Sequence, residues 1–256
     1  MNGVRIVGLR SGEGSSGYQE RGYRNLLPDS NLISFQVAVK ETDLYIKATR
    51  DLQGLARDSV IRHRYHLERY ISRHPEFFSS LVPLTAADYA PPIVKEMMKA
   101  AQCAGVGPMA AVAGAMAESV GRDLLKESPE IIVENGGDVF LRSSRALQVG
   151  IFAGNSPLSF KVGLRVPPAE HGWGVCTSSG TVGPSLSFGR ADAVCILSRS
   201  ASLADAAATA VGNVVGCPGD LSKGLEKAQT IDGLTGVVII IEGKLAAWGE
   251  VELIEI

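Results

Sequence analysis

The stretch Ile131-Ile-Val-Glu-Asn-Gly-Gly-Asp-Val-Phe140 decides how the chain is organised. Its three β-branched residues predict a buried strand, and the residues after the glycines predict the returning strand of a hairpin. Asn-Gly is a leading turn signal, and Gly136 and Gly137 free the backbone for positive φ values. A turn alone requires neither Glu134 nor Asp138. These two carboxylates are therefore candidate functional groups, set against the alternative of a purely structural turn.

Strands and helices are expected on both sides of this hairpin. Alternating residues predict a second hairpin over 34–40 and 43–48, and later strands over 146–153, 158–166, 173–177 and 191–198. Helices are expected from 51 to just before Pro75, from 92 to about 103, from 110 to 121, over 203–213 with Ser202 as cap, and over 218–228; a hairpin of 236–242 with 245–256 closes the chain. Residues 10–30, rich in Gly, Ser and charge, predict a flexible or ligand-ordered segment. This order favours one domain, 1–256, of mixed α/β (α+β) class.

Composition excludes several functional classes. The net charge of −2 gives no electrostatic case for nucleic acid or an anionic membrane as partner. No run approaches the ~20 apolar residues of a membrane span, and the N-terminus lacks the apolar core of a signal peptide. The four cysteines match no metal-binding spacing, so buried thiols are expected for Cys176 and Cys195. The sequence predicts a cytoplasmic protein, and its small-residue helices permit a homodimer.

Gly105-Val-Gly-Pro-Met-Ala110 has the form of a dinucleotide-binding fingerprint. That fingerprint needs a strand directly before its first glycine, whereas a helix is predicted there, so a Rossmann fold is rejected. Two interpretations stay open: free backbone N–H groups at the following helix could bind a phosphate, or the small residues serve close packing. His63 and His66 share a helix face, but surrounding arginines favour a solvated face over a metal site.

A run of hydroxyls and glycines follows the strand at 173–177 and predicts an anion or ribose cradle. It consists of Thr177, Ser178, Ser179, Gly180 and Thr181 and continues to Gly189. Neither a phosphate-binding P-loop nor a serine-hydrolase elbow is present. Farther on, Asp205 and Thr209 lie four residues apart on an alanine-rich helix. A carboxylate and a hydroxyl on one face suit a hard cation, and the alternative is that Asp205 complements the positive end of its own helix.

These stretches occur in an order that resembles the ApbE-like superfamily of FAD:protein FMN transferases. The resemblance rests on Asn135-Gly-Gly-Asp138, Gly174-Val-Cys-Thr-Ser178 with Gly180, and Leu203-Ala-Asp-Ala-Ala-Ala-Thr-Ala210. Gly105–Gly114, Glu134–Asp138 and Ser187–Asp192 look like a cytoplasmic, uncharacterised branch of it. The resemblance spans about residues 23–250 and implies an ApbE-like fold: two related lobes of sheet and packed helices with a cleft between them.

The resemblance also implies ligands. Asp205 and Thr209 match the positions that hold Mg²⁺ near the FAD pyrophosphate, and Ala113 would contribute its carbonyl. Asn135, Gly136, Gly137 and Asp138 would line the nucleotide site, and the 177–181 cradle would contact the cofactor. An acceptor protein would then supply the hydroxyl that attacks the FMN phosphorus, with Asp138 or Glu134 as base.

Two departures from the transferases favour binding over FMN transfer. The chain reads Ala113-Gly-Ala115 where the transferases have Ala-Lys-Gly, and 181–190 lacks their His-x-x-Asp-Pro segment. The sequence therefore predicts a flavin- or nucleotide-binding protein in which Mg²⁺-assisted pyrophosphate chemistry is open. The alternatives are a non-catalytic binding module that keeps the fold, and an enzyme for another phosphorylated metabolite that uses Arg190.

Overall fold

The computed structural model describes residues 32–85, 89–180 and 188–256. Its strands are β1 (Ile33–Val39), β2 (Thr42–Ala48), β3 (Ile131–Asn135), β4 (Asp138–Arg142), β5 (Leu147–Gly150), β6 (Val162–Val166), β7 (Trp173–Ser178), β8 (Ala193–Ser198), β9 (Leu234–Ile241), β10 (Lys244–Gly249) and β11 (Glu252–Glu255). Its helices are α1 (Gln53–Arg73), α2 (Pro75–Ser79), α3 (Pro92–Ala104), η2 (Pro108–Ala111), α4 (Val112–Leu124), α5 (Ala201–Gly212), η3 (Pro218–Asp220) and α6 (Leu221–Gln229). The predicted mixed α+β class is confirmed.

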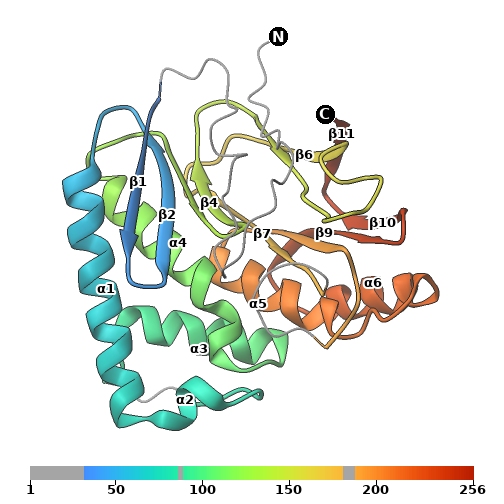
Figure 1. Cartoon of the computed structure of the whole chain (residues 1–256), viewed down its shortest axis with the longest axis horizontal. Coiled ribbons are helices and arrows are strands. Elements are labelled where there is room, and N and C mark those ends of the chain that lie inside the picture. Colours follow the sequence, from blue (N-terminus) through green and yellow to red (C-terminus); the bar gives the residue numbers. More distant parts are fainter. Residues whose placement is uncertain (1–31, 86–88, 181–187) are drawn as a thin grey trace, which may run out of the picture.

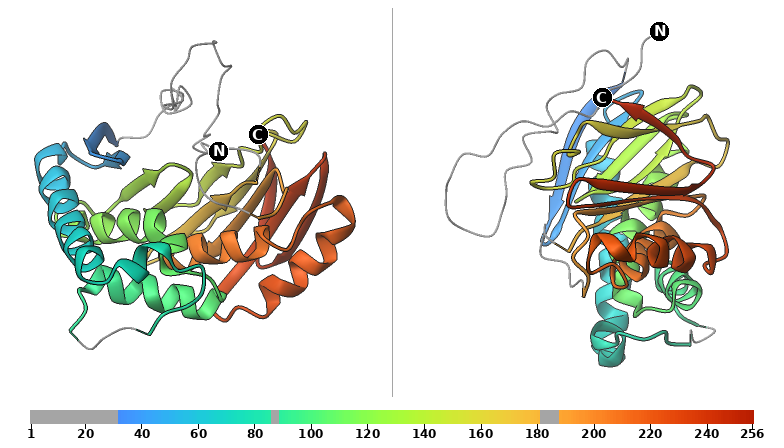
Figure 2. Two further views of the ribbon diagram at one scale, coloured as in Figure 1. Left: turned by 60° about the horizontal axis from the view of Figure 1, so that its bottom comes forward. Right: turned by 90° about the vertical axis from the view of Figure 1, so that its right-hand side faces the viewer.

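Eight strands form one antiparallel sheet in the order β1-β2-β3-β4-β7-β8-β9-β10. The helices cover one face of this sheet, and a three-stranded sheet, β11-β6-β5, lies over part of the other face (Figures 1 and 2). The β3–β4 hairpin closes at the pair Asn135–Asp138 around Gly136 and Gly137, which have φ values of 69° and 113°. No parallel pair occurs among the strands described, in agreement with the rejection of a Rossmann fold.

The sheet separates two apolar cores, and strand alternation decides which residues enter each. In β4, Phe140 packs into the core beneath the helices, whereas Val139 and Leu141 pack against the three-stranded sheet. The same alternation in β7 sends Cys176 to the helices and Val175 to the small sheet. Any residue on these strands can therefore be assigned to the helix face or to the opposite face.

Two predicted features are wrong. Ser200, not Ser202, caps α5 by accepting the Leu203 N–H at 3.3 Å; Ser202 lies in the first turn because the helix begins earlier than its alanine run suggests. The closing hairpin ends at Gly249, and β11 pairs with β6 instead of extending β10, since the positive φ of Gly249 (88°) turns the chain away. The predicted segment 10–30 lies outside the described residues.

All four cysteines are free thiols. Cys176 and Cys195 are buried thiols, as predicted, and Cys103 and Cys217 are exposed thiols. No single helix among the described residues is long and apolar enough to cross a bilayer, although Pro92–Ala104 and Pro108–Leu124 pass that test together as a pair bent by 106°.

Asp123 joins α4 to α1. Its Oδ2 accepts hydrogen bonds from the Ser59 hydroxyl at 2.7 Å and from His63 Nε2 at 2.8 Å, and Arg62 forms an ion pair with it. His63 is therefore half-buried against a carboxylate, and only His66 of the two lies on the solvated face. Burial by itself would raise the pKa of Asp123, but the hydrogen bonds from Ser59 and His63 and the charges of His63 and Arg62 outweigh it and lower the pKa.

Replacing Asp123 with asparagine is expected to lower the free energy of unfolding by about 1–2 kcal/mol at pH 6, because three donors lose a charged acceptor. The pKa of Asp123 is lower in the folded state than in the unfolded state. Its stabilisation is therefore present above the unfolded-state pKa and is lost as the pH falls through the folded-state value. Urea unfolding at pH 6 and pH 3 should show a deficit that shrinks at pH 3. Asp58→Asn, on the exposed side of α1, is the control, and an equal deficit at both pH values would contradict the prediction.

Candidate functional site

The turn between β3 and β4 contacts the start of α4. Asn135, on the helix face, donates from Nδ2 to the Ala113 carbonyl at 3.1 Å. Asp138 begins β4 on the same face and is only 8% exposed. It is paired with Cys176 of β7, so a thiol and a carboxylate lie side by side under the helices. Burial, followed by the charges of Asp138 and Asp205, raises the pKa of Cys176, which keeps this thiol neutral.

The side chain of Asp205, on α5, also contacts the start of α4. Its Oδ2 accepts the Gly114 N–H at 2.9 Å, which makes it a cap for the first turn of α4. Burial and then the neighbouring charge of Asp138 raise the pKa of Asp205 well above its ordinary range, against the effect of backbone hydrogen bonds from Gly114 and Ala113. Asp138 and Asp205 thus form a carboxylate pair whose members repel each other when both are ionised. The alternative role, in which Asp205 serves its own helix, is wrong, because the carboxylate lies at the start of another helix.

Glu118 makes the reciprocal contact, and the sequence reasoning missed it. From α4, its Oε2 accepts the backbone N–H groups of Ala201 at 2.8 Å and Ser202 at 3.2 Å, and the Ser200 hydroxyl at 3.1 Å. Its Oε1 accepts from Arg122 Nε at 3.0 Å. Each helix therefore supplies the carboxylate that caps the other. The available signal was that Glu118 is the one charged residue between 110 and 121.

The two carboxylates singled out on the β3–β4 hairpin lie on opposite faces of the sheet. Glu134 of β3 pairs with Tyr45 of β2 and lies two residues after Ile132. Ile132 packs toward the three-stranded sheet, so Glu134 lies on that face of the large sheet. Asp138 lies on the helix face, with Asn135. Lys47 of β2 lies on the same face of the large sheet as Glu134, opposite the face that the helices cover. Its side chain is buried, and this burial lowers its pKa to about 8. The structure thus brings Asp138, and not Glu134, beside Asp205.

The hydroxyl-rich segment is only partly associated with this pair. Thr177 is opposite Cys195 of β8 on the face that packs against the three-stranded sheet, while Ser178 ends β7 on the helix face. The Gly180 N–H donates to the Ala191 carbonyl at 2.9 Å, which starts the loop after Ser179. Thr181 lies outside the described residues. Thr209 lies one helical turn beyond Asp205 and is half-buried.

The oxygen atoms near Asp205 are of the kind that a hard divalent cation binds. The Asp205 carboxylate lies within the electrostatic range of the Asp138 carboxylate, Thr209 carries a hydroxyl one turn farther along α5, and the Ala113 carbonyl accepts from Asn135 at the start of α4. A cation there would favour ionisation of both carboxylates, which otherwise oppose each other. The parts of the chain that are described contain no group of three or more His, Cys, Asp and Glu side chains suited to a metal. Any cation must therefore depend on backbone and hydroxyl oxygens.

The glycine-rich approach to α4 has a packing role. Gly105 ends α3 in the left-handed conformation, with φ of 76°, and a Cβ on Gly107 would lie 1.8 Å from the Ser80 carbonyl oxygen. The Gly114 N–H is already bound to Asp205, so it is not free for a phosphate. A Cβ on Gly114 would lie 2.2 Å from the Ala201 carbonyl oxygen. The packing of α4 against α5 therefore leaves no room for a side chain at position 114.

Comparison with known proteins identifies both a family and a fold. The family described as "AbpE bacteria" matches residues 24–247. A UPF0280 protein of Methanococcus aeolicus is 42% identical over 216 residues, 82% of this chain and 87% of its own length. A UPF0280 protein of Methanococcus vannielii is 44% identical over 217 residues, with coverages of 82% and 88%.

Solved structures of flavin transferases share the fold. The flavinyl transferase ApbE of Pseudomonas stutzeri, in its apo form, superposes with a TM-score of 0.58 at 14% identity, over 85% of this chain and 93% of that one. The flavin transferase ApbE of Vibrio cholerae gives 0.54 at 11% identity, with coverages of 85% and 96%. At such identities the likeness concerns the arrangement of helices and strands and not the chemistry.

Proposed function

Because the chain belongs to the AbpE bacteria family and has the fold of the ApbE flavin transferases, we propose that it binds a flavin or related nucleotide beside the Asp138–Asp205 carboxylate pair with the aid of a divalent cation. One observation carries the proposal. The Asp205 carboxylate accepts the Gly114 N–H at the start of α4 and lies within the electrostatic range of Asp138. The names of the structural neighbours, which include flavin transferases, support flavin as the ligand class.

In this proposal Asp205, Thr209 and the Ala113 carbonyl hold the cation. A bound Mg²⁺ would supply Lewis-acid stabilisation to a pyrophosphate. Asn135 holds the Ala113 peptide in place through its 3.1 Å hydrogen bond, and Gly136 and Gly137 keep side chains away from the turn. Ser178, Ser179 and Gly180 provide polar groups at the end of β7 for the ligand's ribose or phosphates.

A transferase is the second candidate, and the position of Asp138 favours it. Asp138 is the hairpin carboxylate on the same face as Asp205, so it is the candidate base for an acceptor hydroxyl. That hydroxyl would form the new P–O bond to FMN while the bond to AMP breaks. The absence of lysine at Gly114 speaks against it. A module that keeps only the fold would bind its ligand equally well with and without metal, which separates the candidates.

Asp205→Asn is expected to weaken FAD binding in Mg²⁺ at least about tenfold, because the amide is a poor ligand for a hard cation. The amide oxygen still accepts the Gly114 N–H, so the fold should survive. Purified protein should be titrated with FAD, FMN and ADP, each in Mg²⁺ and in EDTA, with flavin fluorescence and calorimetry as readouts. EDTA should weaken wild-type binding as strongly as the substitution does.

The matched control is Asp58→Asn, which makes the same chemical change on the exposed side of α1. Circular dichroism and thermal melting should show that both variants fold. Equal FAD affinity in Mg²⁺ and EDTA, unchanged in Asp205→Asn, would contradict the role of a cation. Failure of all three nucleotides to bind would contradict the proposed ligand class.

A further inference from the structure

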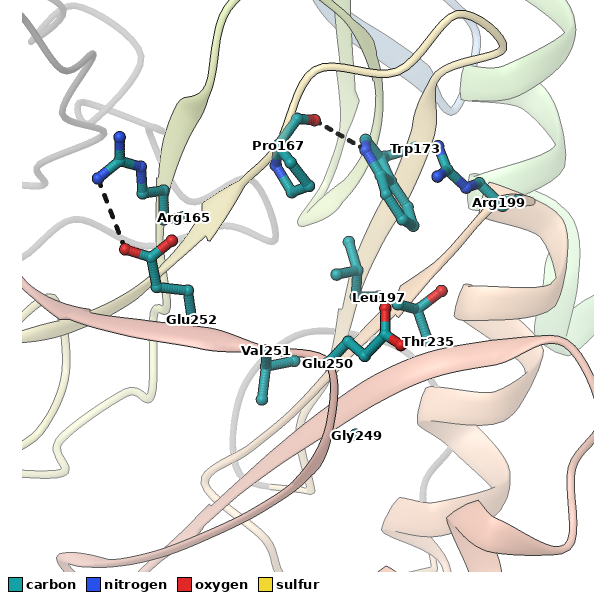
Figure 3. A pocket seen from close by; sticks show the side chains of 10 residues that line it. All are labelled: Arg165, Pro167, Trp173, Leu197, Arg199, Thr235, Gly249, Glu250, Val251 and Glu252. Atoms are coloured by element: carbon teal, nitrogen blue, oxygen red, sulfur yellow. Dashed lines mark hydrogen bonds and ion pairs between the residues drawn. The ribbon is translucent and has the colours of Figure 1, made fainter.

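An open pocket of about 400 Å³ lies at the end of the large sheet away from the carboxylate pair. Asp138 pairs with Cys176 near the end of β7, whereas Trp173, which lines the pocket, begins that strand. Segments from both sheets form the walls of this pocket. The residues that line it are Arg165, Pro167, Trp173, Leu197, Arg199, Thr235 and 249–252 (Figure 3). The proposed nucleotide site uses none of these residues.

Arg199 lies over the Trp173 ring on one wall of the pocket. Its guanidinium carbon lies 3.5 Å from the centre of the Trp173 ring, and Figure 3 shows the two groups side by side. The indole is itself fixed, because Nε1 donates to the Pro167 carbonyl at 2.9 Å and Trp173 is only 4% exposed. Stacking occupies a face of the guanidinium and leaves the N–H edges to bind an oxyanion in bidentate fashion. Within the described chain, Arg199 has no carboxylate partner.

The pocket is lined by two arginines and two glutamates, so its formal net charge is zero. Arg165 is paired with Glu252 at 3.5 Å, whereas Glu250 forms no ion pair with any described residue. The Glu250 N–H donates to the Thr235 carbonyl at 2.8 Å, which fixes the backbone that carries its side chain. One arginine and one glutamate thus remain to receive opposite charges. Two carboxylates in the lining disfavour a polyphosphate or any other multiply charged anion.

We propose that this pocket binds a small zwitterion of the α-amino acid class. Arg199 receives the carboxylate, Glu250 receives the ammonium group, and Leu197 and Val251 contact an apolar side chain. The volume of about 400 Å³ accommodates a molecule of that size. Because the Arg199 guanidinium already lies on the hydrogen-bonded Trp173 ring, binding loses less side-chain freedom at the carboxylate end than it would for an unsupported arginine.

The test uses the full chain and three leucine derivatives in calorimetric titrations. Leucine carries both charges, N-acetylleucine only the carboxylate, and leucinamide only the ammonium group. Leucine should bind, and each blocked derivative should bind at least about tenfold more weakly, since each loses a charge-assisted contact. The chain has two tryptophans, so Trp248→Phe leaves Trp173 as the fluorescent reporter of the pocket.

Arg199→Gln should weaken both leucine and N-acetylleucine at least tenfold, whereas Glu250→Gln should weaken leucine and leave N-acetylleucine unchanged. Both residues are exposed, so the substitutions should not unfold the chain, and Arg57→Gln on α1 is the charge-matched control. FAD titration should be unaffected in all three variants. Undetectable leucine binding at millimolar concentration, or equal leucine affinity in Arg199→Gln and Arg57→Gln, would overturn the proposal.

Discussion

Replacing Gly114 with alanine should lower the free energy of unfolding by about 3 kcal/mol, the upper range for overpacking a close contact. The added Cβ would lie 2.2 Å from the Ala201 carbonyl oxygen and 2.8 Å from the Asp205 Cβ. The first of these atoms is backbone in the opening turn of α5, so the two helices must move apart. The gain of about 1 kcal/mol in helix propensity for alanine over glycine is too small to offset that displacement.

Gly54→Ala is the control for this prediction. Gly54 lies in the first turn of α1, and a Cβ there would meet nothing within 4 Å. Alanine at this position should be neutral or stabilise by up to about 1 kcal/mol through its helix propensity. Urea unfolding of both variants measures the difference, and Gly114→Ala should also weaken FAD binding because Asp205 would shift. Equal stability of the two variants would contradict the proposed α4–α5 contact.

The second large effect is expected for Glu118→Ala, at about 3 kcal/mol. The substitution leaves the N–H groups of Ala201 and Ser202 and the Ser200 hydroxyl without their acceptor, in a region where Glu118 is only 8% exposed. Buried donors that lose an acceptor cost about 1–3 kcal/mol each, and the net cost falls where a donor finds water. Loss of the negative charge at the start of α5 adds to this through the helix dipole.

Two further substitutions serve as comparisons for the loss of stability expected in Glu118→Ala. Glu118→Gln keeps an acceptor oxygen and should cost less than Glu118→Ala. Glu127→Ala removes an exposed glutamate that pairs with Arg50, and exposed pairs contribute about 1 kcal/mol or less. Thermal and urea unfolding should therefore rank the variants Glu118→Ala, Glu118→Gln, Glu127→Ala from least to most stable. A cost for Glu118→Ala no larger than that for Glu127→Ala would show that α5 is capped in another way.

Much of this fold can be predicted because local pattern determines it. Alternation marked β1 and β2, and Asn135-Gly-Gly-Asp138 marked the central turn with its register. The same register also determines on which faces of the sheet the two hairpin carboxylates lie. A two-residue turn pairs Asn135 with Asp138, so Glu134 and Asp138 must point to opposite faces.

The contacts that remained hidden are those between segments distant in the chain. Nothing near Asp205 indicates that it caps α4, since the bonded groups are 91 residues apart. Nor does the sequence around Glu250 indicate a neighbour such as Arg199, because that pocket assembles from the ends of strands in two sheets. Such sites depend on how strands are ordered in the sheets, which local periodicity does not encode.

The reciprocal capping of α4 and α5 bears on the order in which the chain matures during synthesis. Asp205 caps a helix start 91 residues away and Glu118 one 83 residues away, and the six strands from β3 to β8 are made in between. In a nascent chain that has emerged only as far as β8, α4 lacks its cap and Asp138 lacks its neighbour, because Asp205 has not yet been made. Closure of this region must wait until α5 leaves the ribosome, so the first half of the protein cannot complete the proposed ligand site in advance of the second.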